Sequence, residues 1–270
     1  MPLTDFQKKL LAVLAPARTP ESYLAGGAAL HFAPNSVRFS HDLDLFHDRV
    51  ESVARAFAQD QDLLAAEGYG MEVVLSQPGH IRAVVRRDAQ ATLIDWAHDS
   101  SWRFTPLVRD ELGGYLLHEM DLAVNKTLVL AGRDEIRDFV DILYVHERIL
   151  PLGAAVWAAV GKDPGFTPLS LLEQLRRRGR YRQADVERLD LACPFDLIDA
   201  KGRWLAAMAD AEAFVLTRPP SEAGCLYYAP SRRRFEAPGP DAGLEAQGLV
   251  VHFVRPGGVL PRPSDQRLAP

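Results

Sequence analysis

The chain has 270 residues, of which 47% are hydrophobic and 25% are charged, and its formal net charge is −5. No stretch approaches the ~18 uninterrupted apolar residues of a membrane span, so we expect no membrane partner. The negative charge argues against a protein that coats nucleic acid indiscriminately. The length allows two small domains.

The N-terminal segment predicts a structural helix and not a signal peptide. Thr4 and Gln7 have the spacing of a capping box, and the segment has only a short apolar run. The two cysteines, Cys193 and Cys225, lie far apart with no metal-ligand spacing. We therefore expect a cytoplasmic protein whose two thiols are free.

Residues 23–25 predict a short strand that ends at Gly26-Gly27, followed by a helical turn or two over residues 28–32. A strand, two glycines and a helix start expose backbone N–H groups, and the helix dipole favours an anion there. Glycine also lets a phosphate approach the backbone without a Cβ in the way. Gly26 and Gly27 are therefore a candidate phosphate cradle, although most such pairs are simple turns.

Residues 37–46 predict a strand that carries Asp42 and Asp44. Alternate side chains of a strand point the same way, so the two carboxylates share one face, about 6.6 Å apart along the backbone. Two carboxylates 4 Å apart repel by roughly 4 kcal/mol at an effective dielectric constant of 20. A divalent cation removes that repulsion, and Mg²⁺ binds carboxylates together with phosphate oxygens. The alternative interpretation is a solvated strand end.

A helix capped by Asp48 is predicted over residues 50–67, and strands over 71–76, 80–87 and 91–97. Asp95 is the one charge within the last, apolar strand. Because an unpaired buried carboxylate is unfavourable, Asp95 is either paired with a nearby arginine or is a third metal ligand that can accept a proton from an attacking hydroxyl. We expect these elements to form a small mixed sheet with helices on one face.

Helices dominate the remainder of the chain. They are predicted over residues 118–131, 134–149, 154–160, 168–178, 184–191 and 195–216. Short strands are predicted at 225–228, 234–236 and 249–254. The sequence therefore predicts an α+β protein whose second half is mainly helical.

A basic run spans the C-terminal end of the fourth of these helices and the residues after it. Its arginines surround Tyr181, a composition that suits RNA phosphates and an unstacked base. The alternative is a solvated helix terminus with cations at its C-terminal end. The candidate RNA-binding residues are Arg176, Arg177, Arg178, Arg180 and Arg182.

Several of these motifs occur in the order seen in a known group of enzymes. YLAGGAAL, RFSHDLDLF and a lone aspartate on a later strand resemble the nucleotidyltransferases of the DNA polymerase β superfamily. Asp121-Leu-Ala-Val-Asn-Lys126, then Arg133 and Arg137-Asp138-Phe-Val-Asp141, are similar to motifs of the AbiEii/AbiGii-type toxin family. The resemblance spans residues 20–148. One departure is that the superfamily often has Gly-Ser where this chain has Gly26-Gly27.

The resemblance implies a polymerase β-like nucleotidyltransferase core over residues 1–112. A mainly helical domain over 113–270 would carry a terminal β hairpin near 225–255. The implied metal ligands and catalytic residues are Asp42, Asp44 and Asp95. The implied nucleotide-binding residues are Gly26, Gly27, Arg38, Ser40, Lys126, Asp138 and Asp141.

Structural alternatives remain for three of these residues. Lys126 is either a charge for the triphosphate or a snorkelling side chain at a helix surface. Asp138 and Asp141 share one helix face. They either orient Lys126 or contact the nucleotide in a cleft, or they are favourable charges near a helix N-terminus.

The implied activity moves an NMP from an NTP to an acceptor hydroxyl with Mg²⁺ or Mn²⁺. The 3′ end of tRNA is the leading acceptor, and the implied role is the toxin of a bacterial toxin–antitoxin or phage-defence pair with a cognate antitoxin. The alternatives are transfer to a small molecule or a protein hydroxyl, and a non-catalytic nucleotide-binding module.

Overall fold

The structure is a computed structural model that describes residues 3–32, 36–240 and 243–261. The chain divides into two compact units. The first unit comprises residues 1–101, 106–118 and 190–193, and the second unit comprises 102–105, 119–189 and 194–270. The boundary expected after residue 112 lies inside the segment 106–118, which packs with the first unit.

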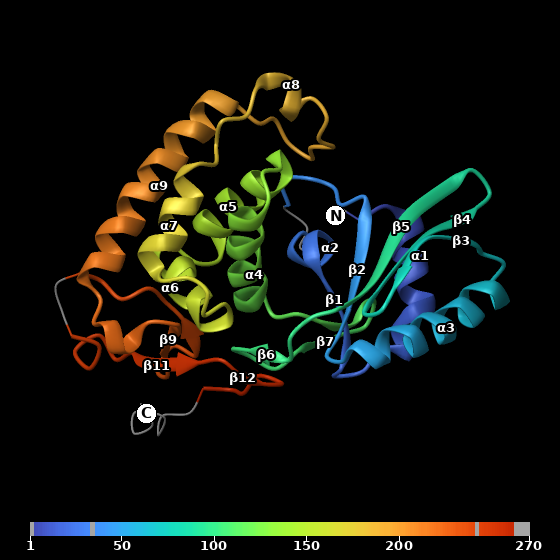
Figure 1. Cartoon of the computed structure of the whole chain (residues 1–270), viewed down its shortest axis with the longest axis horizontal. Helices are drawn as coiled ribbons and strands as arrows, with labels where there is room; N and C mark the ends of the chain where they lie inside the picture. The colour runs from blue at the N-terminus through green and yellow to red at the C-terminus, as the bar shows by residue number, and fades with distance from the viewer. Residues whose placement is uncertain (1–2, 33–35, 241–242, 262–270) are drawn as a thin grey trace. The chain divides into compact units, whose positions relative to one another are not determined.

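A seven-stranded mixed sheet forms the first unit, with the strand order β3-β4-β5-β2-β1-β8-β7 (Figure 1). β2 is parallel to β5 and β1 is parallel to β8, whereas the other neighbours are antiparallel. The strands are β1 (Ser22–Ala25), β2 (Asp42–His47), β3 (Gly70–Gln77), β4 (His80–Arg87), β5 (Gln90–His98), β7 (Val108–Asp110) and β8 (Gly114–Leu116).

Two longer helices and two short ones accompany this sheet. The capping box of Thr4 and Gln7 is present at the start of α1, as predicted. The N-cap of α3 is Arg49 and not Asp48, because Arg49 has the extended backbone of an N-cap and directly precedes Val50, the first helical residue. The helices are α1 (Asp5–Leu14), η1 (Ala15–Ala17), α2 (Gly26–Leu30) and α3 (Val50–Ala66).

The long helix α3 packs on one face of the sheet, against β2, β3, β4 and β5. Leu43 and Leu45 of β2 are fully buried, and the indole N–H of Trp96 in β5 donates to Asp60 of α3 at 2.7 Å. Successive side chains of a strand point to opposite faces. Asp44 lies between Leu43 and Leu45, and Asp95 directly precedes Trp96. The side chains of Asp44 and Asp95 therefore lie on the face opposite α3.

The predicted strand over residues 37–46 is shorter than expected and begins at Asp42. The backbone before it bonds to another segment of the first unit. Arg38 forms a bridge with Leu191, and the N–H of Phe39 donates to the carbonyl of Asp190 at 2.8 Å. Since these backbone groups are already paired, residues 37–41 do not extend the sheet ladder.

Helices form most of the second unit, and α9 packs along α5, α6 and α7 (Figure 1). Each of the predicted helices has a counterpart, although the one expected over 184–191 is only a single turn. They are α4 (Glu119–Gly132), α5 (Ile136–Arg148), α6 (Leu152–Lys162), α7 (Pro168–Arg176), α8 (Gln183–Val186), α9 (Leu197–Thr217) and η2 (Pro220–Glu222).

The second unit also contains two small sheets. β9 (Cys225–Ala229) lies between β10 (Arg234–Phe235) and β11 (Val250–Phe253), so the expected hairpin is a three-stranded antiparallel sheet. β6 (Trp102–Arg103) pairs with β12 (Arg255–Pro256). The architecture is thus α+β, as predicted. In the described part of the chain, no helix has the length and apolar character needed to cross a bilayer.

Candidate active site

The three predicted acidic residues lie on one face of the sheet in the first unit. β2 and β5 are parallel neighbours, and Asp44 is in register with Asp95. Neighbouring strands lie about 4.8 Å apart, and residues in register point to the same face. Asp42 precedes Asp44 by two residues on β2 and so shares that face. Sheet pairing therefore brings together carboxylates that are 51 positions apart in the chain, from Asp44 to Asp95.

Gly26 makes room for Asp44 at the start of α2. Its φ of +63° is in the left-handed region, and a Cβ built on it would lie 1.7 Å from Oδ2 of Asp44. No side chain can occupy that space while the Asp44 carboxylate stays in place. Ala25 and Asp44 are partners in the β1–β2 ladder, which fixes this approach. The diglycine is therefore part of the acidic site.

The second glycine, Gly27, lies against the side chains of Arg38 and Ser40. A Cβ on Gly27 would lie 2.9 Å from a guanidinium nitrogen of Arg38 and 3.0 Å from Oγ of Ser40. Ser40 in turn donates to Oδ1 of Asp42 at 3.0 Å. Arg38 and Ser40 therefore lie beside Gly27 and the strand that carries Asp42.

The α1 helix anchors the segment that leads into β2. The side-chain amide of Gln7 donates to the carbonyl of Ser40 at 2.8 Å, and Oγ1 of Thr92 donates to the carbonyl of His41 at 2.9 Å. Both bonds hold the backbone immediately before Asp42. The position of the first acidic residue is therefore fixed from two elements, α1 and β5.

The surroundings of Asp95 fit both predicted roles, the pair with a nearby arginine and the metal ligand. Its Oδ1 lies 2.6 Å from Nε2 of His80 and accepts from Nε of Arg82 at 2.8 Å. The side chain is only 5% exposed, and its Oδ2 is buried without a hydrogen-bond partner among the described residues. One oxygen is thus held by His80 and Arg82, and the other is available. His80 and Arg82 are site residues that the sequence reasoning missed.

The negative charges of all three acidic residues act on Arg82. Its pKa is raised, first by the hydrogen bond to Asp95 and then by the charges of Asp95, Asp42 and Asp44, while partial burial opposes the shift. All three carboxylates therefore act on one guanidinium, and their negative charge favours a bound cation.

The carboxylates suit a divalent ion, although they do not surround one point in this conformation. Within residues 3–32, 36–240 and 243–261, no three acidic, histidine or cysteine side chains form a ready metal-binding group. The donor set nevertheless fits Mg²⁺ or Mn²⁺, which need hard oxygen ligands. The buried, unpaired Oδ2 of Asp95 and the close approach of Asp44 to Gly26 support that fit.

In the second unit, Lys126 of α4 is buried in a charge network with α5. Its ammonium lies 2.7 Å from Oδ2 of Asp141 and 3.7 Å from Oδ1 of Asp138. Arg133 donates two hydrogen bonds to Asp138, at 2.6 and 3.0 Å. The two carboxylates are fully buried and Lys126 is 8% exposed. Of the alternatives, Asp138 and Asp141 orient Lys126; the predicted contacts with a nucleotide stay a prediction.

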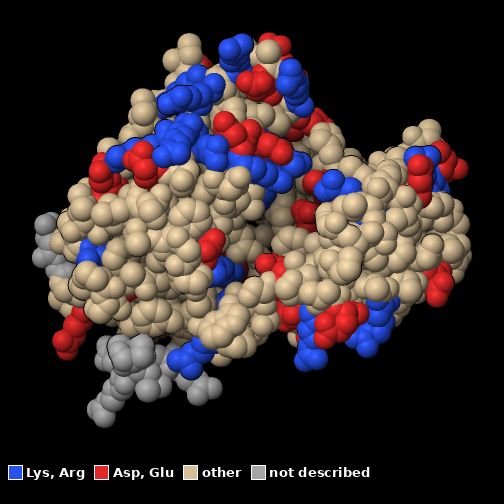
Figure 2. Space-filling model, in the orientation of Figure 1, with Lys and Arg blue, Asp and Glu red and all other residues tan. Residues whose placement is uncertain are grey.

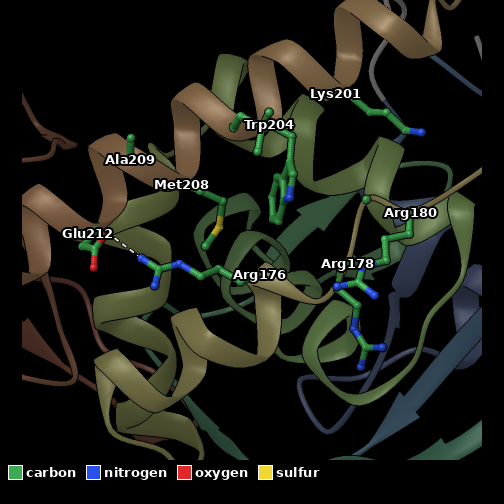
Figure 3. A pocket seen from close by; sticks show the side chains of 10 residues that line it. Arg176, Arg178, Arg180, Lys201, Trp204, Met208, Ala209 and Glu212 are labelled. Carbon is green, nitrogen blue, oxygen red and sulfur yellow. Dashed lines mark ion pairs between the residues drawn. The ribbon is translucent and has the colours of Figure 1, made fainter.

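The basic run lines a cavity of about 530 Å³ in the second unit. Arg176, Arg178 and Arg180 approach it from one side, and Trp204 and Met208 project from α9 on the other (Figure 3). Lys and Arg side chains gather over α7, α8 and the N-terminal part of α9 on the face in view (Figure 2). The positive charge expected for this region is therefore present on its surface.

Individual members of the run have different roles. Arg176 pairs with Glu212 at 2.5 Å, and Arg178 donates to the carbonyls of Leu130 and Ala131 at the C-terminal end of α4. Arg177, Arg180 and Arg182 are exposed.

The expected base-stacking role of Tyr181 is wrong. This residue is buried, its hydroxyl donates to Asp134 at 2.7 Å, and its ring packs against Phe139. Because neither ring face is open to solvent, Tyr181 cannot stack on a nucleobase.

Comparison with known proteins gives no match to a family model and no match to a curated protein. Solved structures do match. JHP933 from Helicobacter pylori has a TM-score of 0.48 at 15% identity, covering 79% of this chain and 95% of its own. A candidate nucleotidyltransferase from the same organism has 0.49 at 16%, with coverages of 78% and 94%.

A third structure is more similar by this measure. MenT4, a nucleotidyltransferase toxin from Mycobacterium tuberculosis H37Rv, has a TM-score of 0.54 at 17% identity, covering 77% of this chain and 82% of its own. The likeness to MenT4 establishes that this chain shares the fold of a nucleotidyltransferase, as the sequence predicted.

Proposed function

We propose that the chain is a metal-dependent nucleotidyltransferase that moves an NMP from an NTP to an acceptor hydroxyl. The observation that carries the proposal is the acidic face of the first unit. Asp44 and Asp95 are in register on parallel strands, Asp42 shares their face, and Gly26 leaves the space that Asp44 occupies. The nucleotidyltransferase fold shared with MenT4 supports the same reaction class.

Asp42, Asp44 and Oδ2 of Asp95 would hold Mg²⁺ or Mn²⁺. When bound, the ions would offset the charge of the triphosphate and of the attacking and leaving oxygens. Arg82 and His80 hold Asp95 by its other oxygen. With Oδ1 held in this way, Oδ2 would also accept the proton of an acceptor hydroxyl. Gly26 and Gly27 would let the phosphates approach the backbone closely.

RNA is the acceptor that we favour, with the 3′ end of tRNA as the leading case. Arg180 lines the 530 Å³ cavity, and Arg177 and Arg182 are exposed beside it. Exposed guanidinium groups bind phosphate oxygens, and that binding weakens with salt because counterions are released. The similarity to MenT4, a nucleotidyltransferase toxin, supports a toxin role for this chain. A toxin of such a pair would have a cognate antitoxin as its partner.

The test is to incubate the purified protein with each α-³²P-labelled NTP, Mg²⁺ and total bacterial RNA. We expect label on small RNA with one or more nucleotides, and none after chelation by EDTA. Asp44→Asn is the matched inactive variant and should lower the rate by about a thousandfold or more, since it removes one charge from the metal face. Equal labelling by wild type and this variant would overturn the proposal.

The acceptor is tested by a separate variant. Arg180→Glu should reduce labelling of RNA by about tenfold or more and weaken its salt dependence. Arg86→Glu is the matched control, because Arg86 is an exposed arginine of β4 that pairs only with the exposed Glu72. Label on protein or on a small molecule, with none on RNA, would exclude the RNA acceptor and leave nucleotidyl transfer intact.

A further inference from the structure

The helix α9 is apolar on two opposite faces. Its inner face, which includes Trp204, Ala207, Met208 and Val215, is buried within the second unit. Its outer face carries Ile198, Leu205 and Leu216, which are 84%, 70% and 66% exposed. A helix that is hydrophobic all round is normally covered on both sides. Large exposed apolar side chains in a row mark a surface that binds something.

The outer face has the spacing of a coiled-coil seam. Apart from Ala206, which follows Leu205 directly, its positions are separated by steps of three or four residues, the spacing that keeps a row of side chains on one face of a helix. Small side chains lie among the large ones, so two backbones could approach to about 8 Å. We name this set the α9 stripe: Ile198, Gly202, Leu205, Ala206, Ala209, Ala213 and Leu216, all exposed.

The α9 stripe is complementary to itself in the antiparallel direction. Ile198 and Leu216 lie nine positions on either side of Ala207, and Leu205 and Ala209 lie two positions on either side. A two-fold axis level with Ala207 would therefore place Ile198 opposite the Leu216 of a second copy, and Leu205 opposite its Ala209. An isologous interface requires this reciprocal relation between the same residues on both copies.

The charges beside the α9 stripe obey the same symmetry. Lys201 and Glu212 flank one edge, and Arg203 and Asp210 flank the other; each pair is centred within one residue of Ala207. In an antiparallel pair each cation would lie beside the acidic residue of the second copy. Within one chain Lys201 donates to the carbonyl of Tyr181 and Glu212 pairs with Arg176. The charges would therefore favour the orientation more than they add affinity.

From this complementarity we infer that the occupant of the α9 stripe is a second copy of the chain, bound through an antiparallel α9–α9 contact about a two-fold axis level with Ala207. The inference does not involve the acidic face of the first unit, but Leu205 and Ala209 also line the 530 Å³ cavity proposed for RNA, so the second copy and RNA would compete for this part of α9. The apolar residues supply the contact, and the flanking charges select the antiparallel direction.

Engineered cysteines test the geometry directly, in full-length protein whose exposed Cys193 is replaced by Ser. Ala206→Cys lies one residue from the axis, so its two copies are offset by about 3 Å along the helices and can form a disulfide. Ala213→Cys is the matched control, because its copies are offset by about 18 Å. Rapid covalent dimer formation by the first variant alone is expected. Cross-linking of both would indicate a parallel pair, and cross-linking of neither would indicate no α9 contact; either result overturns the inference.

Sedimentation of the uncross-linked protein gives a second readout. Leu205→Glu should raise the dissociation constant of the dimer by about tenfold or more, since it puts a charge at the centre of the seam. Val74→Glu is the control, because Val74 is also exposed, at 51%, but lies on β3 of the first unit. Circular dichroism would confirm that both variants are folded. A wild-type protein that stays monomeric at high micromolar concentration would leave the stripe to another partner and contradict the inference.

Discussion

Gly26 is the residue on which the geometry of the acidic site depends most. We predict that Gly26→Ala lowers the free energy of unfolding by about 2 kcal/mol or more and abolishes transfer, because the added Cβ meets the Asp44 carboxylate. Gly68→Ala is the matched control: its φ is +78°, but nothing lies within 4 Å of the added Cβ. It should lose only about 1 kcal/mol from backbone strain. Thermal denaturation and the labelling assay measure both effects, and equal behaviour of the two variants would contradict this role.

Arg82 and Asp95 form the second residue-scale test. Arg82→Ala should destabilise the protein by about 1–3 kcal/mol at neutral pH, because the buried Asp95 carboxylate loses its guanidinium donor and keeps only His80. Arg86→Ala, which removes an exposed pair with Glu72 on the same strand, should change stability by less than about 1 kcal/mol. Urea titration of the three proteins at pH 7 compares them. A loss no larger for Arg82→Ala than for Arg86→Ala would show that Asp95 needs no partner.

At the residue scale, the sequence predicted the shared face of Asp42 and Asp44 because strand periodicity fixes it. The approach of Gly26 to Asp44 could not be predicted, since it follows from the β1–β2 register. His80 and Arg82 did have a sequence signal. The predicted strands 80–87 and 91–97 are separated by three residues, and hairpin pairing puts Arg82 opposite Asp95. Pairing the two predicted strands would have identified Arg82.

At the scale of elements, the network between α4 and α5 is a test of packing. Asp141→Ala should lower the free energy of unfolding by about 3 kcal/mol, because it leaves the buried Lys126 ammonium with only the more distant Asp138. Adding Lys126→Met should recover much of that loss by removing the stranded charge. Asp199→Ala is the control, since Asp199 is exposed and pairs with Arg203 on the same helix, outside this network. A double variant less stable than Asp141→Ala would contradict this account.

His47 links β2 to the pH dependence of stability. It is buried on the α3 side of the sheet, and burial, then the charge of Arg18, lowers its pKa to about 4. The unfolded chain binds this proton below about pH 6.5 and the folded chain only near pH 4, so stability falls as pH decreases through that window. The contribution approaches about 3 kcal/mol. His47→Gln should flatten the slope of unfolding free energy between pH 6.5 and 4; an unchanged slope would exclude His47 as its source.

Long periodic elements were predicted well, and short ones were not. α5 and α9 carry apolar stripes and lie within a few residues of their predicted bounds, and α1 begins at the predicted capping box. β6, β7 and β8 are two or three residues long, which is too short for a periodic signal. Composition predicted a strand over residues 37–41, but the backbone of this segment forms hydrogen bonds with residues 190–192. No local sequence pattern encodes such a long-range contact.

On the scale of the whole molecule, the sequence predicted the α+β architecture and the succession of core strands and later helices along the chain. It did not predict how the two units exchange segments. Residues 102–105 belong to the second unit, and 190–193 return to the first. These assignments depend on contacts between distant segments, such as the pairing of β6 with β12. Composition and motif order identify a fold, whereas such contacts require the three-dimensional structure.

The central claim is that the acidic face of the first unit binds divalent metal together with a nucleotide. The most direct measurement is an electron paramagnetic resonance titration of Mn²⁺ in the presence of a non-hydrolysable NTP. The account predicts saturable binding by the wild type that Asp44→Asn weakens at least about tenfold. Arg86→Ala should bind like the wild type. Absence of saturable Mn²⁺ binding by the folded wild type, or equal binding by Asp44→Asn, would contradict it.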